Sequence, residues 1–200
     1  MNIWIVRHGE TDKNREKLLQ GRSNAPLNEN GIRQAEAVRD FFRTQETRMD
    51  TVYASPLLRA VQTARIVAGD ETEIITDELL LEMDYGPYEG ASLENPAPEL
   101  LYFFRDFVHH PAPEGMESLE QVKTRMGVFL ERIKESGADN ILIATHAIAM
   151  KGALEYLTPE SNGAYWSKTI GTCTVYHSVY DGMRYTVPKE AFAIGHEPGV

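Results

Sequence analysis

Cysteine is almost absent from this chain of 200 residues, and its scarcity sets the first limits. The single thiol, Cys173, excludes an intramolecular disulfide and any metal site built from several cysteines. A chain with one cysteine suits a reducing compartment, and simple burial is the expected role of this one.

Long apolar runs and basic clusters are also lacking. No stretch approaches the ~18 apolar residues of a membrane-spanning helix, and Met1-Asn2 leads into a short apolar run without a basic leader. The net charge is −10 with no Lys/Arg cluster to offset it, so nucleic acid and membranes are not expected partners. We therefore expect a cytoplasmic protein whose anionic ligands are held by a few focused cations.

What is present is the composition of an ordinary globular domain, with 42% hydrophobic and 25% charged residues. The length favours one domain spanning residues 1–200. Short apolar runs alternate with amphipathic runs of helical spacing, which predicts an α/β fold. The expected strands are 3–6, 51–54, 73–75 and 140–144, with a C-terminal hairpin of 172–176 and 183–187; the expected helices are 32–42, entered through Asn30-Gly31, and 56–68, 119–137 and 147–157.

Two of the expected strands end in a histidine. The run 3–6 is followed directly by Arg7 and His8, and the run 140–144 leads through a threonine to His146. In an open parallel sheet, groups just past the carboxyl ends of strands line the binding crevice. Both histidines are therefore expected to face a ligand.

The strand 51–54 adds a third group at the same edge. Ser55-Pro56 follows it as the expected N-cap and first residue of a helix, which carries Arg59 in its first turn. If the three strands are neighbours, two histidines and two arginines converge on one small anion.

This combination suits phosphoryl transfer. Arg7 and Arg59 can hold the oxygens of a phosphoryl group and neutralise its charge. Nearby cations disfavour the imidazolium form, so His8 stays neutral and nucleophilic, while His146 serves as a donor to the transition state. Glu82 is the expected acid that protonates the leaving group and later activates water, with Asp84 as its rival.

On these residues the chain resembles the histidine phosphatase superfamily, also called phosphoglycerate mutase-like. The resemblance extends from Ile5 to about Gly152 and includes many motifs in order. They are Arg7-His8-Gly9-Glu10-Thr11 with Asn14; Leu19-Gln20-Gly21-Arg22; Pro26-Leu27, Gly31 and Gln34-Ala35; Ser55-Pro56-Leu57-Leu58-Arg59-Ala60 with Gln62-Thr63-Ala64; Glu82 with Gly86, Glu89 and Gly90; Gly115 and Glu117-Ser118; and Thr145-His146.

The resemblance implies a fold and a set of roles. It implies three α/β/α layers around a mostly parallel sheet. The composition shifts at about 91–117, where four prolines surround an apolar helix-like run, which predicts a helical or loop lid insertion at about 84–117 that covers the crevice. The resemblance implies a phosphohistidine at His8, a phosphate pocket of Arg7, Arg59 and His146, and Glu82 as acid/base. No metal or other cofactor is implied. The further substrate contacts are expected from Asn14, Gln20, Gly21 and Ala147.

Two positions depart from the usual pattern of the superfamily. Ala147 follows the second histidine where relatives usually carry glycine, which narrows the space beside the pocket, and Asn24 stands where many carry aspartate. Neither change removes a catalytic group, so activity is expected.

A phosphomonoesterase acting on a small phosphorylated metabolite is the favoured function. From 83 to 122 the only basic residue is Arg105, against eight carboxylates, and aromatic residues are frequent, which favours a neutral or aromatic leaving group. The alternatives are a phosphoglycerate mutase, which the cations Lys13, Arg15, Lys17 and Arg22 would serve, and a protein that binds phosphorylated ligands without turnover. A homodimer is possible.

Overall fold

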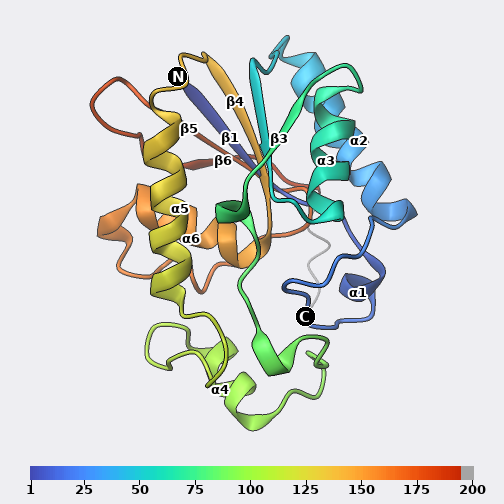
Figure 1. Cartoon of the computed structure of the whole chain (residues 1–200), viewed down its shortest axis with the longest axis vertical. Coiled ribbons are helices and arrows are strands. Elements are labelled where there is room, and N and C mark those ends of the chain that lie inside the picture. The colour runs from blue at the N-terminus through green and yellow to red at the C-terminus, as the bar shows by residue number, and fades with distance from the viewer. Residues whose placement is uncertain (195–200) are drawn as a thin grey trace.

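A six-stranded sheet forms the centre of the molecule, as a computed structural model describing residues 1–194 shows (Figure 1). The strands are β1 (Asn2–Arg7), β2 (Thr51–Ala54), β3 (Ile74–Thr76), β4 (Asn140–Thr145), β5 (Val175–Val179) and β6 (Lys189–Phe192). Their order is β3-β2-β4-β1-β5-β6. The first four run parallel, and β5 pairs antiparallel with both β1 and β6.

Helices cover both faces of the sheet. They are α1 (Asp12–Arg15), α2 (Glu29–Thr44), α3 (Leu58–Ala68), α4 (Pro98–Arg105), α5 (Leu119–Ile133) and α6 (Ala147–Leu157), with three short 3₁₀ turns, η1 (Glu78–Leu80), η2 (Gly86–Tyr88) and η3 (Pro159–Ser161). Side chains of β1 and β4 alternate between the faces: Ile3 and Ile5 join the cluster that includes α5 and α6, whereas Trp4 and Val6 join the one formed with α2 and α3. The predicted three-layer fold with a mostly parallel sheet is confirmed.

Capping residues fix where two helices begin. Ser118 and Gln121 form the predicted capping box of α5. Asn28 caps α2 by accepting from the Gly31 N–H at 2.8 Å, so this helix starts earlier than the expected entry at Asn30-Gly31.

The prediction for Ser55 was wrong. Helix α3 begins at Leu58, with Leu57 at its N-cap and no side chain accepting from the first turn. Ser55 is fully buried, and its hydroxyl lies 2.7 Å from His146 Nε2. The side chain that resembled a helix cap therefore contacts the second histidine.

The C-terminal hairpin also differs from the prediction. The chain does turn at Asp181-Gly182, where Tyr180 and Tyr185 form an isolated bridge. The partner of β5, however, is Lys189–Phe192, which lies beyond the expected 183–187. Met183 and Val187 explain the error. Their apolar side chains predicted a strand, but both are exposed and neither lies in the sheet.

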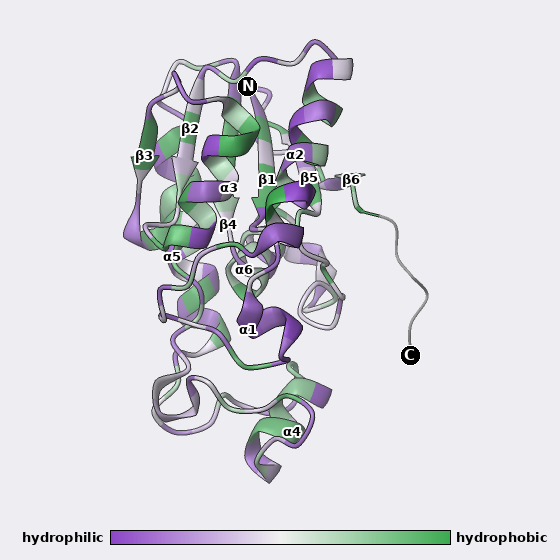
Figure 2. Cartoon of the chain, turned by 90° about the vertical axis from the view of Figure 1, so that its right-hand side faces the viewer, coloured by the Kyte–Doolittle hydropathy of each residue, from purple (hydrophilic) through white to green (hydrophobic). Residues whose placement is uncertain are grey.

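The segment 84–117 lies beyond the carboxyl ends of the parallel strands. Figures 1 and 2 show α4 at the opposite end of the molecule from the N-terminus, and the colours of Figure 2 mark both hydrophilic and hydrophobic residues along this helix. Leu100 and Phe103 anchor α4 in the main core. The two ends of the segment meet at Gly86 and Gly115. Gly86 has a φ of +50°, and a Cβ at this position would clash with the Gly115 carbonyl, so a side chain does not fit there.

Within residues 1–194, no helix is long and apolar enough to cross a membrane.

Candidate active site

The carboxyl ends of β1, β4 and β2 lie side by side and bring the predicted residues together. β4 pairs with both other strands, so its end is central. The His8 N–H donates to the Thr145 carbonyl at 2.9 Å, and the Ser55 N–H donates to the Ala144 carbonyl at the same distance. The convergence expected from the three strand ends is present.

His8 is held as a neutral imidazole with a defined tautomer. Its Nδ1 lies 2.7 Å from the Gly9 carbonyl, which can only accept, so Nδ1 carries the proton. Nε2 then keeps its lone pair and accepts from Arg59 Nε at 3.2 Å. Burial, followed by the charges of Arg59 and Arg7, holds the pKa of His8 well below its ordinary value.

Close backbone contacts explain the residues that follow His8. A Cβ on Gly9 would lie 2.4 Å from the Gly31 carbonyl oxygen, so a side chain does not fit there. The Gly9 N–H donates to Thr63 Oγ1, and the Thr63 hydroxyl donates to the Arg59 carbonyl. The loop after β1 is thus fixed to α2 and α3.

Arg59 is fully buried beside His8. Its Nη1 donates to the Ser23 carbonyl at 2.7 Å, and its Nη2 donates to the Gly21 carbonyl at 2.8 Å. Burial lowers its pKa to about 10, against the opposing effect of Glu82. The Gly21 N–H was predicted to contact the substrate, but it donates to Glu89 Oε2 instead. In this structure Gly21 contributes to the site through its carbonyl, which accepts from Arg59.

Arg7 lies at the end of β1, with its side chain turned into the same site. Nη1 donates to the Ile170 carbonyl at 2.5 Å, while Nε is buried without a hydrogen-bond partner. Burial lowers the pKa of Arg7, and the carboxylate of Glu82 partly offsets this. The guanidinium therefore retains donors for an anionic ligand.

His146 contacts His8 edge to face, with ring centroids 5.1 Å apart. Its Nε2 lies 2.7 Å from Ser55 Oγ, and its Nδ1 is buried without a partner. Burial and the Arg59 charge hold the pKa of His146 well below its ordinary value. If the Ser55 hydroxyl donates to Nε2, Nδ1 carries the proton and is the atom left for a ligand.

Glu82 sits at the N-terminus of α6, where three backbone donors meet one oxygen. Oε1 accepts from the N–H groups of Met83, Ile148 and Ala149 at 2.9 to 3.1 Å, whereas Oε2 has only a 3.2 Å contact to Ile148. Oε2 is thus the oxygen available for a proton. Asp84 is exposed and accepts from the Gly86 N–H, outside the cavity wall.

Arg125 on α5 supports the segment that carries Glu82. Its Nη1 donates to the carbonyls of Leu79 and Leu81, and Glu117 pairs with its Nε at 2.7 Å. Arg125 was not predicted as part of the site. A lone arginine in an amphipathic helix gives no sequence signal for such a contact.

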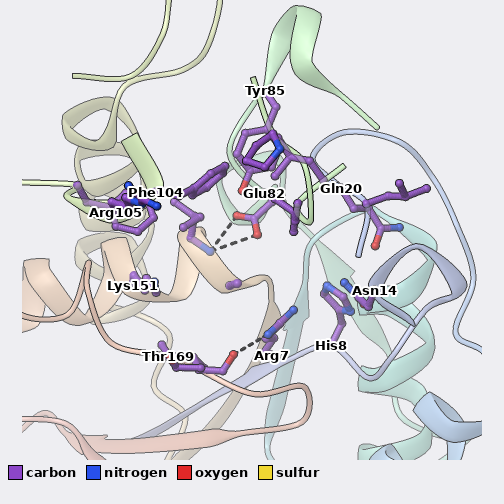
Figure 3. Close-up of a pocket in the computed structure, with 18 of the residues that line it drawn as sticks. Arg7, His8, Asn14, Gln20, Glu82, Tyr85, Phe104, Arg105, Lys151 and Thr169 are labelled. Carbon is purple, nitrogen blue, oxygen red and sulfur yellow. Dashed lines mark hydrogen bonds between the residues drawn. The ribbon is translucent and has the colours of Figure 1, made fainter. Parts of the chain in front are cut away.

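A cavity of about 450 Å³ opens above this cluster (Figure 3). The predicted residues in its wall are Arg7, His8, Asn14, Gln20, Glu82 and Ala147. Asn14 uses its Oδ1 for Thr11, which leaves its amide NH₂ group, and Gln20 has a buried Nε2 without a partner. Arg59, His146 and Gly21 lie outside this wall, and the first two are in contact with His8.

The wall also contains residues that the sequence did not predict, among them Lys151, Thr169 and Ile170. Lys151 is four residues after Ala147 on α6 and therefore shares its face. Helical spacing was the signal that could have found it. Across the described chain, no group of three or more His, Cys, Asp or Glu side chains is arranged to hold a metal ion.

The lowered pKa values of the two active-site histidines make stability depend on pH. Their side chains gain protons near pH ~6.5 in the unfolded chain but only at lower pH in the folded one, so acid favours unfolding. As pH falls below ~6.5, we expect the free energy of unfolding to drop by about 1.4 kcal/mol per pH unit for each histidine. Urea unfolding between pH 7.5 and 5 measures this slope, and His8→Asn or His146→Asn should each lower it by about 1.4 kcal/mol per pH unit. A slope unchanged in both variants contradicts the assignment.

Known proteins show the same sequence pattern and fold. The histidine phosphatase superfamily (branch 1) matches residues 3–190. "Fructose-2,6-bisphosphatase TIGAR B" of Danio rerio is 41% identical over 66% of this chain, and the match spans 52% of that protein, about half its length. "Phosphoglycerate mutase-like protein 4" of Arabidopsis thaliana is 30% identical over 92% of this chain and 82% of its own length. The crystal structure of the alpha-ribazole phosphatase from Shigella flexneri has a TM-score of 0.82 at 25% identity, covering 98% of this chain and all of that one (100%).

Proposed function

The chain belongs to the histidine phosphatase superfamily, and from this premise we propose that it is a phosphomonoesterase acting on a small phosphorylated metabolite. The observation that carries the proposal is His8, a neutral imidazole with its Nε2 lone pair between Arg59 and a cavity that contains Glu82. A nucleophile, cations and an acid within one small site are what phosphoryl transfer through the protein requires.

The first step is attack of His8 Nε2 on phosphorus. The phosphoryl group displaces the hydrogen bond from Arg59 and places its oxygens against that guanidinium, Arg7 and the His146 ring. Asn14 and Gln20 supply amide N–H donors. The new P–N bond forms as the P–O bond to the leaving group breaks, and the fixed donors stabilise the charge on the equatorial oxygens.

Glu82 handles the proton in both steps. Protonated at Oε2, it donates to the leaving oxygen and becomes a carboxylate. A water molecule then gives its proton to that carboxylate and attacks phosphorus. The P–N bond breaks, which returns His8 to its neutral form and releases inorganic phosphate. No step requires a metal ion.

We also propose that residues 84–117 act as a lid within a single domain. Leu93, Pro96, Leu101, Phe104 and Phe107 of this segment form much of the apolar cavity wall. A cover of this kind excludes bulk water from the phosphohistidine and limits the substrate to small molecules.

Phosphate release in the presence of EDTA tests the proposed function. The purified protein is incubated with a panel of phosphomonoesters, including p-nitrophenyl phosphate and 3-phosphoglycerate. Turnover with EDTA present supports a metal-independent phosphatase. Isomerised phosphoglycerate without phosphate release identifies a mutase instead, and no reaction with any ester leaves only ligand binding.

Replacing Glu82 separates its proton from its other contacts. Glu82→Gln can keep the acceptor for the α6 N–H groups but lacks the acidic proton. We expect kcat/KM, which reports formation of the phosphohistidine, to fall by about 10²–10³-fold for alkyl phosphates and by less than about tenfold for p-nitrophenyl phosphate, because p-nitrophenolate leaves without a proton. The kcat value for p-nitrophenyl phosphate should fall further, because hydrolysis of the phosphohistidine also uses Glu82. Asp84→Asn, at the exposed rival carboxylate, is the matched control. Equal losses on both esters mean that Glu82 only positions the substrate.

A further inference from the structure

The loop between α6 and β5 supplies the group that holds Arg7. It runs from 158 to 174 and contains no helix or strand apart from the 3₁₀ turn η3. Near its end, the Ile170 carbonyl accepts from Arg7 Nη1, and within residues 1–194 this is the only hydrogen bond that the Arg7 side chain makes. In Figure 3, Arg7 lies between Thr169 of this loop and His8. The position of the guanidinium therefore depends on where the loop is held.

Glu155, near the end of α6, fixes the first part of this loop. Its Oε2 accepts from the Ser161 hydroxyl at 2.6 Å and from the Gly163 N–H at 3.1 Å, and its Oε1 accepts from the Tyr165 N–H at 2.6 Å. The residue is 4% exposed. One buried carboxylate thus binds two backbone N–H groups and a hydroxyl of the loop, and hydrogen bonds to an ionised acceptor are stronger than bonds between neutral groups.

No cation compensates this carboxylate. Within residues 1–194, no Lys, Arg or His side chain forms an ion pair with Glu155. A buried charge is costly unless hydrogen bonds replace its hydration, so the loop cannot move away without leaving the charge unsatisfied. Lys151, one turn earlier on the same face of α6, adds a second attachment through its bond to the Trp166 carbonyl.

The contacts of Glu155 lie close along the chain to the Ile170 carbonyl. Tyr165 is five residues before Ile170, and the side chains of both residues pack in the main core. Gly163 packs closely against the segment 84–117, because a Cβ on this residue would lie 2.9 Å from Val108 Cγ2. The loop is therefore held between α6, the core and this segment, and a displacement of residues 161–165 would also displace the carbonyl that Arg7 binds.

We infer that Glu155 is a positioning residue for catalysis: its carboxylate holds the loop so that the Ile170 carbonyl orients the Arg7 guanidinium toward the phosphoryl group. The inference rests on the proposed function, in which Arg7 binds the phosphoryl oxygens. Glu155 itself lies outside the cavity wall and touches no substrate. A misplacement of about 1 Å in a site can cost about 10²-fold in rate, so a carboxylate outside the cavity can have a large effect.

Replacing Glu155 by glutamine tests this role. An amide has one acceptor oxygen where a carboxylate has two, so in either orientation its NH₂ group faces a backbone N–H of the loop. We expect kcat/KM for p-nitrophenyl phosphate, per mole of folded protein, to fall by about tenfold or more, and the affinity for orthovanadate to fall by about tenfold. Orthovanadate carries no organic group, so its affinity reports the phosphoryl pocket rather than the rest of the cavity wall.

Asp50→Ala is the matched control. Asp50 also holds two backbone N–H groups, those of Asp139 and Asn140, but it does so at the amino ends of β2 and β4, at the other edge of the sheet from the site. Both substitutions should lower the midpoint of urea unfolding, whereas only Glu155→Gln should lower kcat/KM and the orthovanadate affinity. If Glu155→Gln leaves both values within about twofold of the native ones, Glu155 only stabilises the fold and the inference is overturned.

Combination with Arg7→Met tests whether the effect passes through Arg7. In the native background Glu155→Gln should weaken orthovanadate binding about tenfold, but in the Arg7→Met background by less than about twofold, because the group that it positions is gone. An equal effect in both backgrounds shows that Glu155 acts on another part of the site and contradicts the inference.

Ser161→Ala keeps the test decisive if Glu155→Gln folds poorly. It removes a single donor at a half-buried position, and we expect a smaller loss of orthovanadate affinity, about threefold. An affinity equal to that of the native protein overturns the inference. Because orthovanadate binding requires no turnover, a native protein that hydrolyses no ester contradicts the proposed function, while the affinities of the variants still decide the role of Glu155.

Discussion

His8→Ala should abolish turnover, with kcat falling by about 10⁴-fold or more on every ester. The imidazole lies in the cavity wall, and among the described residues its Nε2 lone pair accepts only from Arg59, a bond that an arriving phosphoryl group can displace. Removing a nucleophile takes away the covalent route altogether, while the binding groups remain. Steady-state phosphate release measures the loss, and calorimetric titration of a phosphomonoester into the variant measures the affinity that remains.

The affinity of His8→Ala separates two accounts of the site. With Arg7 and Arg59 still in place, we expect the variant to bind substrate within about tenfold of the apparent affinity of the native protein. A variant that keeps substantial turnover shows that another residue is the nucleophile. If the native protein has no turnover and both forms bind equally, the chain is a binding protein.

Arg59→Met should have the second largest effect. It removes the cation beside Nε2 and leaves the buried carbonyl of Gly21 and the half-buried carbonyl of Ser23 without their donor. We expect kcat/KM to fall by about 10³-fold, because charge stabilisation in the transition state is lost. Two unsatisfied carbonyls should also lower the free energy of unfolding by about 2 kcal/mol or more.

The same substitution should raise the pKa of His8. Arg59 is the largest charge effect that holds this pKa down, so its removal favours the imidazolium. An NMR titration of the His8 ring in the native and Arg59→Met proteins measures the change. Arg59→Lys is the control, because it retains the charge but cannot donate to the Ser23 and Gly21 carbonyls at the same time as a guanidinium does. The pKa of His8 should therefore rise less in this variant, although kcat/KM still falls. A pKa unchanged by Arg59→Met contradicts the assigned electrostatics.

Much of the fold is readable from the sequence because the strands are buried on both faces. The apolar runs 3–6 and 140–144 match β1 and β4 closely. The capping box at Ser118 marks the start of α5. One error arose because a residue with a local helix-capping signal makes a tertiary contact instead. Ser55 has the residue type of a helix cap, but the hydroxyl bonds His146, which follows a different strand.

The candidate site was predictable to the extent that its residues follow strand ends. His8, His146 and Arg59 meet because β1, β4 and β2 are neighbours, a relation that could be stated only as a condition from the sequence. Lys151 and Arg125 lie within amphipathic helices, and their function depends on what the helices face. Helical spacing places Lys151 on the same face as Ala147, but it is residues 166–170 and α4 that make this face part of a cavity wall, and no local pattern encodes that.

The most direct test is to trap the covalent intermediate. The protein is mixed rapidly with a ³²P-labelled phosphomonoester, quenched in alkali, where a phosphoramidate survives, and digested for mass spectrometry. The account predicts a phosphoryl group on His8, formed at least as fast as turnover, absent from His8→Ala and accumulating to a higher level when its hydrolysis is slowed by Glu82→Gln with p-nitrophenyl phosphate. Steady turnover without any phosphorylated histidine, or with the label on another residue, contradicts it.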